Sequence, residues 1–163
     1  LRDVIWCAGC SHNCPGCQNK EAQNPDLGKE LSQEHFDIIK EDLSKEEIEG
    51  VTFSGGEATF PSNIDEATKM MAWIKNLFPN KTIWVYTGFL YEEIESLEMM
   101  KYIDVLVDGR YVESENPGPG HLKWRGSKNQ RVIDIKETRR QGKVVWLKDF
   151  NGKFIYENET NHD

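Results

Sequence analysis

Residues 7 to 17 read Cys7-Ala-Gly-Cys10-Ser-His-Asn-Cys14-Pro-Gly-Cys17, and this short stretch holds all four cysteines of the 163-residue chain. A thiolate is a soft ligand, and thiols this close together favour a metal centre over disulfides between separated partners. The stretch is therefore predicted to be a metal-binding loop that the rest of the fold supports.

Several kinds of metal centre suit this loop. The pairs Cys7-x2-Cys10 and Cys14-x2-Cys17 can hold one tetrahedral zinc ion, or all four thiolates can close an electron-transfer cluster. The two ligand pairs of a structural zinc site are usually separated by about a dozen residues or more. The short spacing between the two cysteine pairs here would crowd that geometry. Cys10-x3-Cys14-x2-Cys17 resembles the spacing with which radical S-adenosylmethionine (SAM) enzymes hold a [4Fe–4S] cluster. Cys7 is then a small buried residue and not a ligand.

Length and composition describe one globular domain, residues 1–163, with enough apolar residues (37%) for a real core. The net charge of −8 argues against a nucleic-acid partner. Neither a membrane span nor a signal peptide is found, and clustered free thiols fit the cytoplasm. Because the chain begins with Leu1 almost inside a strand, a natural N-terminal segment is expected to be missing. Residues 158–163 are expected to be a frayed tail.

Alternating strand and helix patterns predict an α/β fold. Strands are predicted at 2–7, 50–53, 82–86 and 103–107, and helices at 32–44, 62–78 and 90–101. This order calls for a mainly parallel sheet with right-handed crossovers. Two more strands, at 132–136 and 143–147 around a turn at 139–142, are expected to form a small C-terminal antiparallel extension.

A second motif, Ser54-Gly55-Gly56-Glu57, follows the strand predicted at 50–53. Two glycines let the backbone approach a ligand closely, and Glu57 offers a carboxylate to a ligand ammonium. Alone, such a motif is more often a tight turn with an exposed acid. Because the ends of parallel strands share one sheet edge, the motif is expected to lie beside the cysteine loop. One loop would then hold iron and the other the amino group of SAM.

Four motifs together resemble one family closely. They are Cys10-Ser-His-Asn-Cys14-Pro-Gly-Cys17-Gln-Asn19, Ser54-Gly-Gly-Glu57, Val107-Asp-Gly-Arg110 and Trp124-Arg-Gly-Ser-Lys-Asn-Gln-Arg131. They are similar to those of the activating enzymes of anaerobic (class III) ribonucleotide reductase, which are small radical SAM proteins. The first two motifs indicate only the superfamily, whereas the last two narrow the resemblance to this family.

The resemblance implies a partial, open β/α barrel of the radical SAM type, with a [4Fe–4S] cluster on Cys10, Cys14 and Cys17 and with SAM on the remaining iron. It implies a glycyl-radical-generating activase that takes an electron from an external reductant, cleaves SAM, and removes hydrogen from a glycine of the reductase large subunit. The alternatives are another small radical SAM enzyme, such as another glycyl-radical activase or a carboxy-deazaguanine synthase, and a non-catalytic iron–sulfur or zinc module.

Under the resemblance, a set of residues is assigned to the cofactors: Gly55, Gly56, Glu57, Thr87, Asp108 and His12. The first three would face the SAM amino group, the next two the ribose or methionyl carboxylate, and the histidine the cluster or adenine. A strand-end cap or an exposed loop histidine is the alternative for the last three. Trp124, Arg125 and Arg131 are interpreted as an exposed basic and aromatic patch that docks the reductase or covers SAM.

Overall fold

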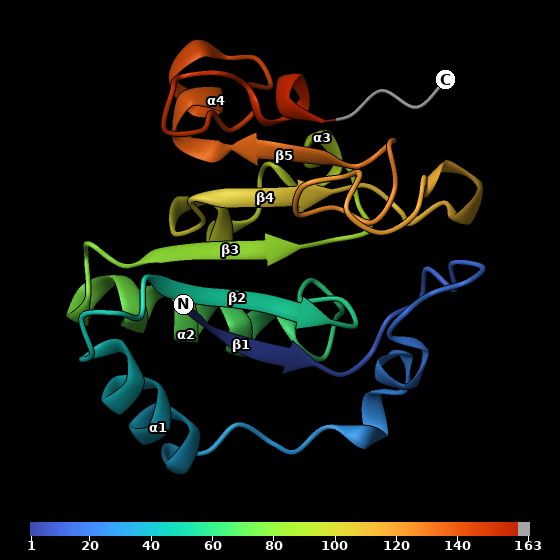
Figure 1. The fold of residues 1–163 in the computed structure, drawn as a ribbon. Helices are drawn as coiled ribbons and strands as arrows, with labels where there is room; N and C mark the ends of the chain where they lie inside the picture. Colours follow the sequence, from blue (N-terminus) through green and yellow to red (C-terminus); the bar gives the residue numbers. More distant parts are fainter. Residues whose placement is uncertain (160–163) are drawn as a thin grey trace.

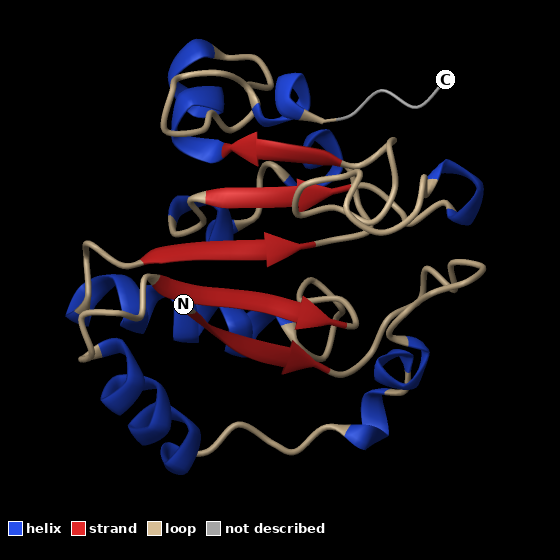
Figure 2. Cartoon of the chain, in the orientation of Figure 1, coloured by secondary structure: helices blue, strands red, loops and turns tan. Residues whose placement is uncertain are grey.

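Runs of β-branched and aromatic residues form one five-stranded sheet in the computed structural model, which describes residues 1–159 (Figures 1 and 2). The strands lie in chain order, β1 (Arg2–Cys7), β2 (Gly50–Gly55), β3 (Thr82–Tyr86), β4 (Val105–Asp108) and β5 (Arg131–Asp134). The first four are parallel, and β5 pairs antiparallel with β4. The predicted mainly parallel α/β sheet with an antiparallel extension is confirmed, and the partial barrel stays a prediction.

The main core lies between one sheet face and the helices α1 (Gln33–Leu43) and α2 (Ile64–Leu77). Alternate strand residues such as Phe53 face the apolar stripe of α2, whose Met71 and Ile74 are fully buried. The methionines of α2 therefore serve the core, as predicted. This packing fixes the four parallel strands so that their carboxyl ends point to one edge (Figure 1).

The opposite sheet face is only half covered. Val105 and Val107 of β4 pack beneath Ile155 from the C-terminal segment. On β1, by contrast, Val4 is 46% and Trp6 is 63% exposed. The uncovered half of this face runs along β1 toward the edge that carries the cysteines.

The single helix predicted at 90–101 is wrong. α3 (Tyr91–Ile94) ends after one turn, and a short 3-10 helix follows at Glu98–Lys101. Leu97 between them has an extended backbone (φ −66°, ψ 142°). Met99 and Met100, which lie in the 3-10 helix after the break, are both buried in the core, so tertiary packing overrides the local helical pattern here.

The second of the two strands predicted near the C-terminus is also wrong. β5 ends at Asp134, and α4 (Ile135–Gln141) occupies the predicted turn. The Asp134 side chain accepts a hydrogen bond from the backbone N–H of Glu137 (3.1 Å), which caps this helix. In the predicted strand at 143–147, Trp146 forms only an isolated bridge to β5. The antiparallel extension is therefore β5 alone.

Short 3-10 helices lie in several of the connections and near the C-terminus: η1 (Lys20–Gln23), η2 (Pro25–Leu27), η3 (Glu98–Lys101), η4 (Glu113–Glu115) and η5 (Ile155–Asn158). Residues 160–163 of the predicted frayed tail lie outside the described residues. Glu159, assigned to the same tail, is held by an ion pair with Arg125. Within residues 1–159, none of the helices has the length and apolar character needed to cross a bilayer.

Candidate metal and cofactor site

Loops that follow β1, β2, β3 and β4 surround one cavity of about 340 Å³ at the shared sheet edge. Cys10, Cys14 and Cys17 line this cavity together, whereas Cys7 lines a separate groove that also contacts α2. Among residues 1–159, no three His, Cys, Asp or Glu side chains are gathered tightly enough for a single metal ion. Three thiols around one cavity are nevertheless a donor set that suits an iron–sulfur cluster.

The protonation of the thiols separates Cys7 from the others. Burial raises the pKa of Cys7 to about 12, and the nearby charge of Glu57 adds to this effect. Cys7 is therefore a neutral thiol at physiological pH. Burial also raises the pKa of Cys10, while a hydrogen bond from the backbone of His12 opposes the rise. A bound metal would displace the Cys10 proton, since thiolates are the binding form.

Backbone hydrogen bonds join the cysteine loop to the glycine motif. The N–H of Gly56 donates to the carbonyl of Cys7 (2.7 Å), and the N–H of Glu57 donates to the carbonyl of Gly9 (2.8 Å). A Cβ atom on Gly56 would lie 2.6 Å from the carbonyl oxygens of Gly9 and Ala22. Glycine is therefore required at position 56 by the approach of the cysteine loop itself.

Glu57 is 2% exposed and lies at the centre of the site. Its Oε1 accepts hydrogen bonds from Nε2 of His12 (2.9 Å) and the N–H of Gly88 (2.8 Å). Its Oε2 accepts from the hydroxyl of Thr59 (3.0 Å), and the hydroxyl of Thr87 lies within 3.0 Å of both oxygens. Burial alone would raise the Glu57 pKa, but the hydrogen bonds, led by His12, lower it.

The predicted cofactor-binding residues therefore divide into five that line the cavity and one, Asp108, that does not. Gly55, Gly56, Glu57, Thr87 and His12 all line the cavity that the cysteines share. The carboxylate predicted to bind an ammonium, however, already accepts hydrogen bonds from four residues of the chain. Its observed role is to connect the cysteine loop with the ends of β2 and β3.

Asp108 does not line this cavity. It is fully buried and accepts hydrogen bonds from the guanidinium of Arg131 (3.0 and 2.5 Å) and from the N–H of Tyr91 (2.8 Å). Arg131 also binds Glu92, and hydrogen bonds to the two carboxylates raise its pKa, with Asp108 contributing most. These contacts join β4, β5 and α3. They agree with the alternative in which Asp108 caps the end of a strand and does not contact a cofactor.

The exposed basic patch predicted at Trp124, Arg125 and Arg131 is wrong for Arg125. The Arg125 side chain is only 6% exposed, pairs with Glu159 and donates to the carbonyl of Lys128 (2.6 Å). Arg131 is committed to the carboxylates described above. Trp124 remains 45% exposed, so the patch offers an aromatic ring and no free guanidinium.

Several residues that support the site were not predicted from the sequence: Thr59, Asn63, Gly88 and Gln130. The Asn63 amide donates to the carbonyls of Ala8 (2.7 Å) and Glu57 (3.1 Å), which ties both motifs to the start of α2. The Gln130 amide donates to the carbonyl of Gly109 (2.9 Å) on the opposite wall. Gln130 belongs to the late motif that signals the family, whereas Asn63 carries no recognisable signal.

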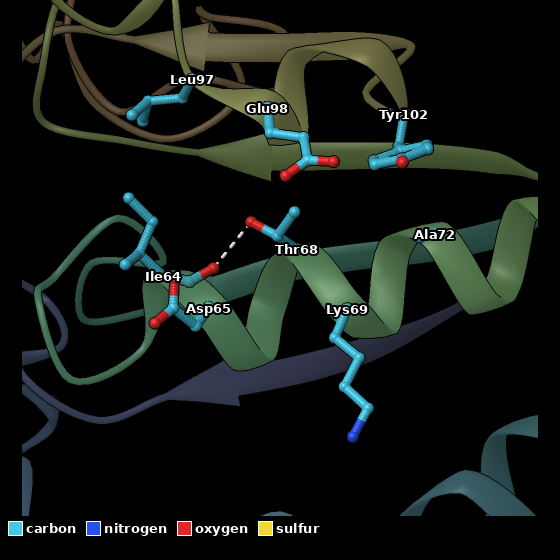
Figure 3. Close-up of a pocket in the computed structure, with 8 residues that line it drawn as sticks. All are labelled: Ile64, Asp65, Thr68, Lys69, Ala72, Leu97, Glu98 and Tyr102. Atoms are coloured by element: carbon cyan, nitrogen blue, oxygen red, sulfur yellow. Dashed lines mark hydrogen bonds between the residues drawn. The ribbon is translucent and has the colours of Figure 1, made fainter.

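A separate pocket of about 380 Å³ lies between α2 and residues 97–102 (Figure 3). Its polar lining residues include Asp65, Lys69 and Glu98. Within α2 the hydroxyl of Thr68 donates to a backbone carbonyl (2.7 Å), as Figure 3 shows. No residue of the cysteine loop or glycine motif lines this pocket, so it plays no part in the site.

Fold and site define an iron–sulfur protein, and the family model described as a 4Fe-4S single cluster domain matches residues 1–133. Three relatives are anaerobic ribonucleoside-triphosphate reductase-activating proteins. That of Enterobacteria phage T4 is 40% identical over 131 residues, which cover 80% of this chain and 82% of the relative. That of Vibrio cholerae is 36% identical over 80% of this chain and 86% of the relative. That of Escherichia coli K12 is 36% identical over 83% of this chain and 89% of the relative.

The chain therefore belongs to the family of anaerobic ribonucleoside-triphosphate reductase-activating proteins. This membership confirms the resemblance found in the sequence motifs. No solved structure matches the chain.

Proposed function

We propose that this protein cleaves SAM reductively at a [4Fe–4S] cluster and generates a glycyl radical on the large subunit of anaerobic ribonucleotide reductase. One observation carries the proposal: three cysteines and the Gly55–Glu57 loop line the same cavity. The names of the relatives, which are reductase-activating proteins, support the reductase as partner. The reaction also needs an external one-electron reductant and suits the cytoplasm.

The residues of the cavity fit these cofactors. Cys10, Cys14 and Cys17 would bind three irons and leave the fourth to SAM, whose amino group would face the backbone of Gly55 and Gly56. When bound, cluster and SAM supply a one-electron cleavage of the C5′–S bond and a radical that takes hydrogen from a glycine Cα. The chain positions both cofactors and keeps water away.

Three of the predicted cofactor contacts act instead as supports in this proposal. Thr87 donates to Glu57 and accepts a hydrogen bond from the N–H of Phe89 (3.1 Å), which occupies its hydroxyl. Asp108 is engaged by Arg131 outside the cavity. Glu57 orients the walls through its buried hydrogen bonds, so the SAM ammonium is left to the neighbouring backbone.

The first test is anaerobic reconstitution with iron and sulfide, followed by reduction in the presence of SAM and the reductase. We expect 5′-deoxyadenosine by chromatography and a glycyl radical by electron paramagnetic resonance. An intact cluster that leaves SAM uncleaved would contradict the proposal in favour of an electron carrier. Cleavage without a glycyl radical would favour another radical SAM reaction, and zinc in place of iron would favour a closed metal site.

The uncovered sheet face is our proposed docking site for the glycine-bearing segment of the reductase. Trp6 and Ser54 belong to this face and also line the cysteine cavity, so the face is continuous with the site. Trp124 packs edge-on against Trp84 of β3 at 5.1 Å between ring centroids. Exposed aromatic rings are the residues that most often anchor a protein partner.

Replacing Trp124 with alanine is therefore expected to weaken activation of the reductase while SAM cleavage without the reductase stays unchanged. Truncation of an aromatic anchor costs about 2 kcal/mol, which corresponds to roughly a thirtyfold rise in the KM for the reductase. Phe150→Ala is the control, because Phe150 is an exposed aromatic residue that lines neither the cysteine cavity nor the pocket that Trp124 lines. Equal KM values for the two variants would contradict docking at Trp124.

A further inference from the structure

The imidazole of His12 occupies a fitted slot between two loops. Its side chain is 5% exposed, and its ring meets that of Phe89 edge-on at 4.6 Å between centroids. A Cβ atom on Gly88 would lie 2.5 Å from Cδ2 of His12. The ring thus fills the space that a side chain at position 88 would need. His12 is therefore a packed interior group and not the exposed loop histidine considered above.

His12 also makes a contact that the rest of the cysteine loop lacks. The start of the loop is held by its backbone, as when the N–H of Cys10 donates to the carbonyl of Gln23 (3.1 Å). From Cys10 to Cys17, within the described part of the chain, the bond from His12 to Glu57 is the one side-chain hydrogen bond to another segment. The middle of the loop is thus anchored at a single point.

Glu57 is a rigid anchor for this contact. Its carboxylate is fixed at the same time by the N–H of Gly88 (2.8 Å) and by the hydroxyls of Thr59 and Thr87 (3.0 and 2.9 Å). The hydrogen bond from His12 is charge-assisted and buried, the setting in which such bonds are strongest. Movement of the histidine would leave the carboxylate without one of its donors.

We propose that His12 is a positioning residue that clasps the cysteine loop to Glu57, and so sets the thiols of Cys10 and Cys14 against the backbone of Gly55 and Gly56. The histidine acts through Glu57 and touches neither cluster nor adenine, because Nε2 is engaged by the carboxylate and the ring by Phe89. The inference rests on the proposed function only for the identity of the cofactors that the positioned thiols and glycine backbone would bind.

The clasp can be tested on the metal-free protein by amide hydrogen exchange of residues 8–18. His12→Ala removes the hydrogen bond, and loss of one charge-assisted bond should speed exchange in this loop by about tenfold or more. His12→Gln places an N–H near the position of Nε2 and should restore slow exchange, whereas the shorter His12→Asn should not. Ser11→Ala is the matched control, because Ser11 is an exposed residue of the same loop.

A second variant separates the effect of the hydrogen bond from that of the ring packing. Phe89→Leu removes the ring that abuts His12 but keeps the hydrogen bond to Glu57, so it should speed loop exchange less than His12→Ala does. The proposal is overturned if His12→Ala exchanges at the wild-type rate, if His12→Asn restores protection as well as His12→Gln, or if exchange rises equally in β2 and β3. Uniform acceleration would mean a stability role without a clasp.

The loaded protein gives an independent readout. With cluster and SAM bound, His12→Ala should alter the electron paramagnetic resonance change that SAM induces and raise the KM for SAM, and His12→Gln should reverse both. A changed KM with unchanged exchange in the metal-free protein would identify a direct cofactor contact and overturn the clasp. If SAM is never cleaved but exchange follows the expected pattern, the proposed function fails while the clasp stands.

Discussion

Replacing Cys14 with serine is expected to abolish the iron–sulfur cluster, whereas replacing Cys7 with alanine is expected to leave it intact. Cys14 shares its cavity with Cys10 and Cys17, and two remaining thiolates cannot hold four irons in place. Cys7 faces the main core from β1, and burial raises its pKa to about 12. A neutral thiol on the far side of the strand is outside the ligand set.

Iron and sulfide analysis after anaerobic reconstitution measures the difference. Wild type and Cys7→Ala should each bind about four irons per chain, and Cys14→Ser should bind under about one. SAM cleavage should follow the iron content. Loss of iron in the Cys7 variant would instead indicate a closed site of four thiolates, as in an electron carrier or a zinc module. Near-normal iron in Cys14→Ser would remove that cysteine from the ligand set.

The sequence was sufficient to predict how the two motifs meet. Strand patterns before Cys10 and before Gly55, separated by a helix, require neighbouring parallel strands whose ends share one edge. β1 and β2 pair in this way, with Cys7 opposite Gly55. Fold class and the shared cavity follow from local patterns and one topological rule, because each pattern lies within a few consecutive residues.

The partners of the polar residues were not predictable in the same way. Glu57 meets His12 across 45 positions and Thr87 across 30, and no local pattern encodes such a meeting. An acidic residue after two glycines is consistent with an exposed ligand contact until the fold buries it. Arg125 was misread for the same reason, since the distant Glu159 that engages it lies in a segment with no pattern of its own.

Of the variants proposed for this protein, Glu57→Ala is expected to lower the free energy of unfolding the most. The change leaves the N–H of Gly88 and the hydroxyl of Thr59 without their acceptor, together with His12 and Thr87. Removing the acceptor of a buried, charged hydrogen-bond network costs about 3–5 kcal/mol in the free energy of unfolding. Glu57→Gln keeps one acceptor oxygen for His12 and Gly88 and should cost less than half as much. Urea denaturation of the metal-free variants measures both losses.

The pH dependence of unfolding separates the charge of Glu57 from its shape. The folded protein lowers the pKa of Glu57 below its ordinary value of 4.5, so the unfolded chain takes up its proton first as the pH falls. The stability that the carboxylate contributes is complete above pH 4.5 and is lost as the pH drops through the folded pKa. The gap in unfolding free energy between wild type and Glu57→Gln should therefore narrow below pH 4.5. A gap that stays constant into the acid range would mean that the carboxylate contributes through shape alone. A narrowing gap would identify the buried charge as the group that holds the cysteine loop, β2 and β3 together.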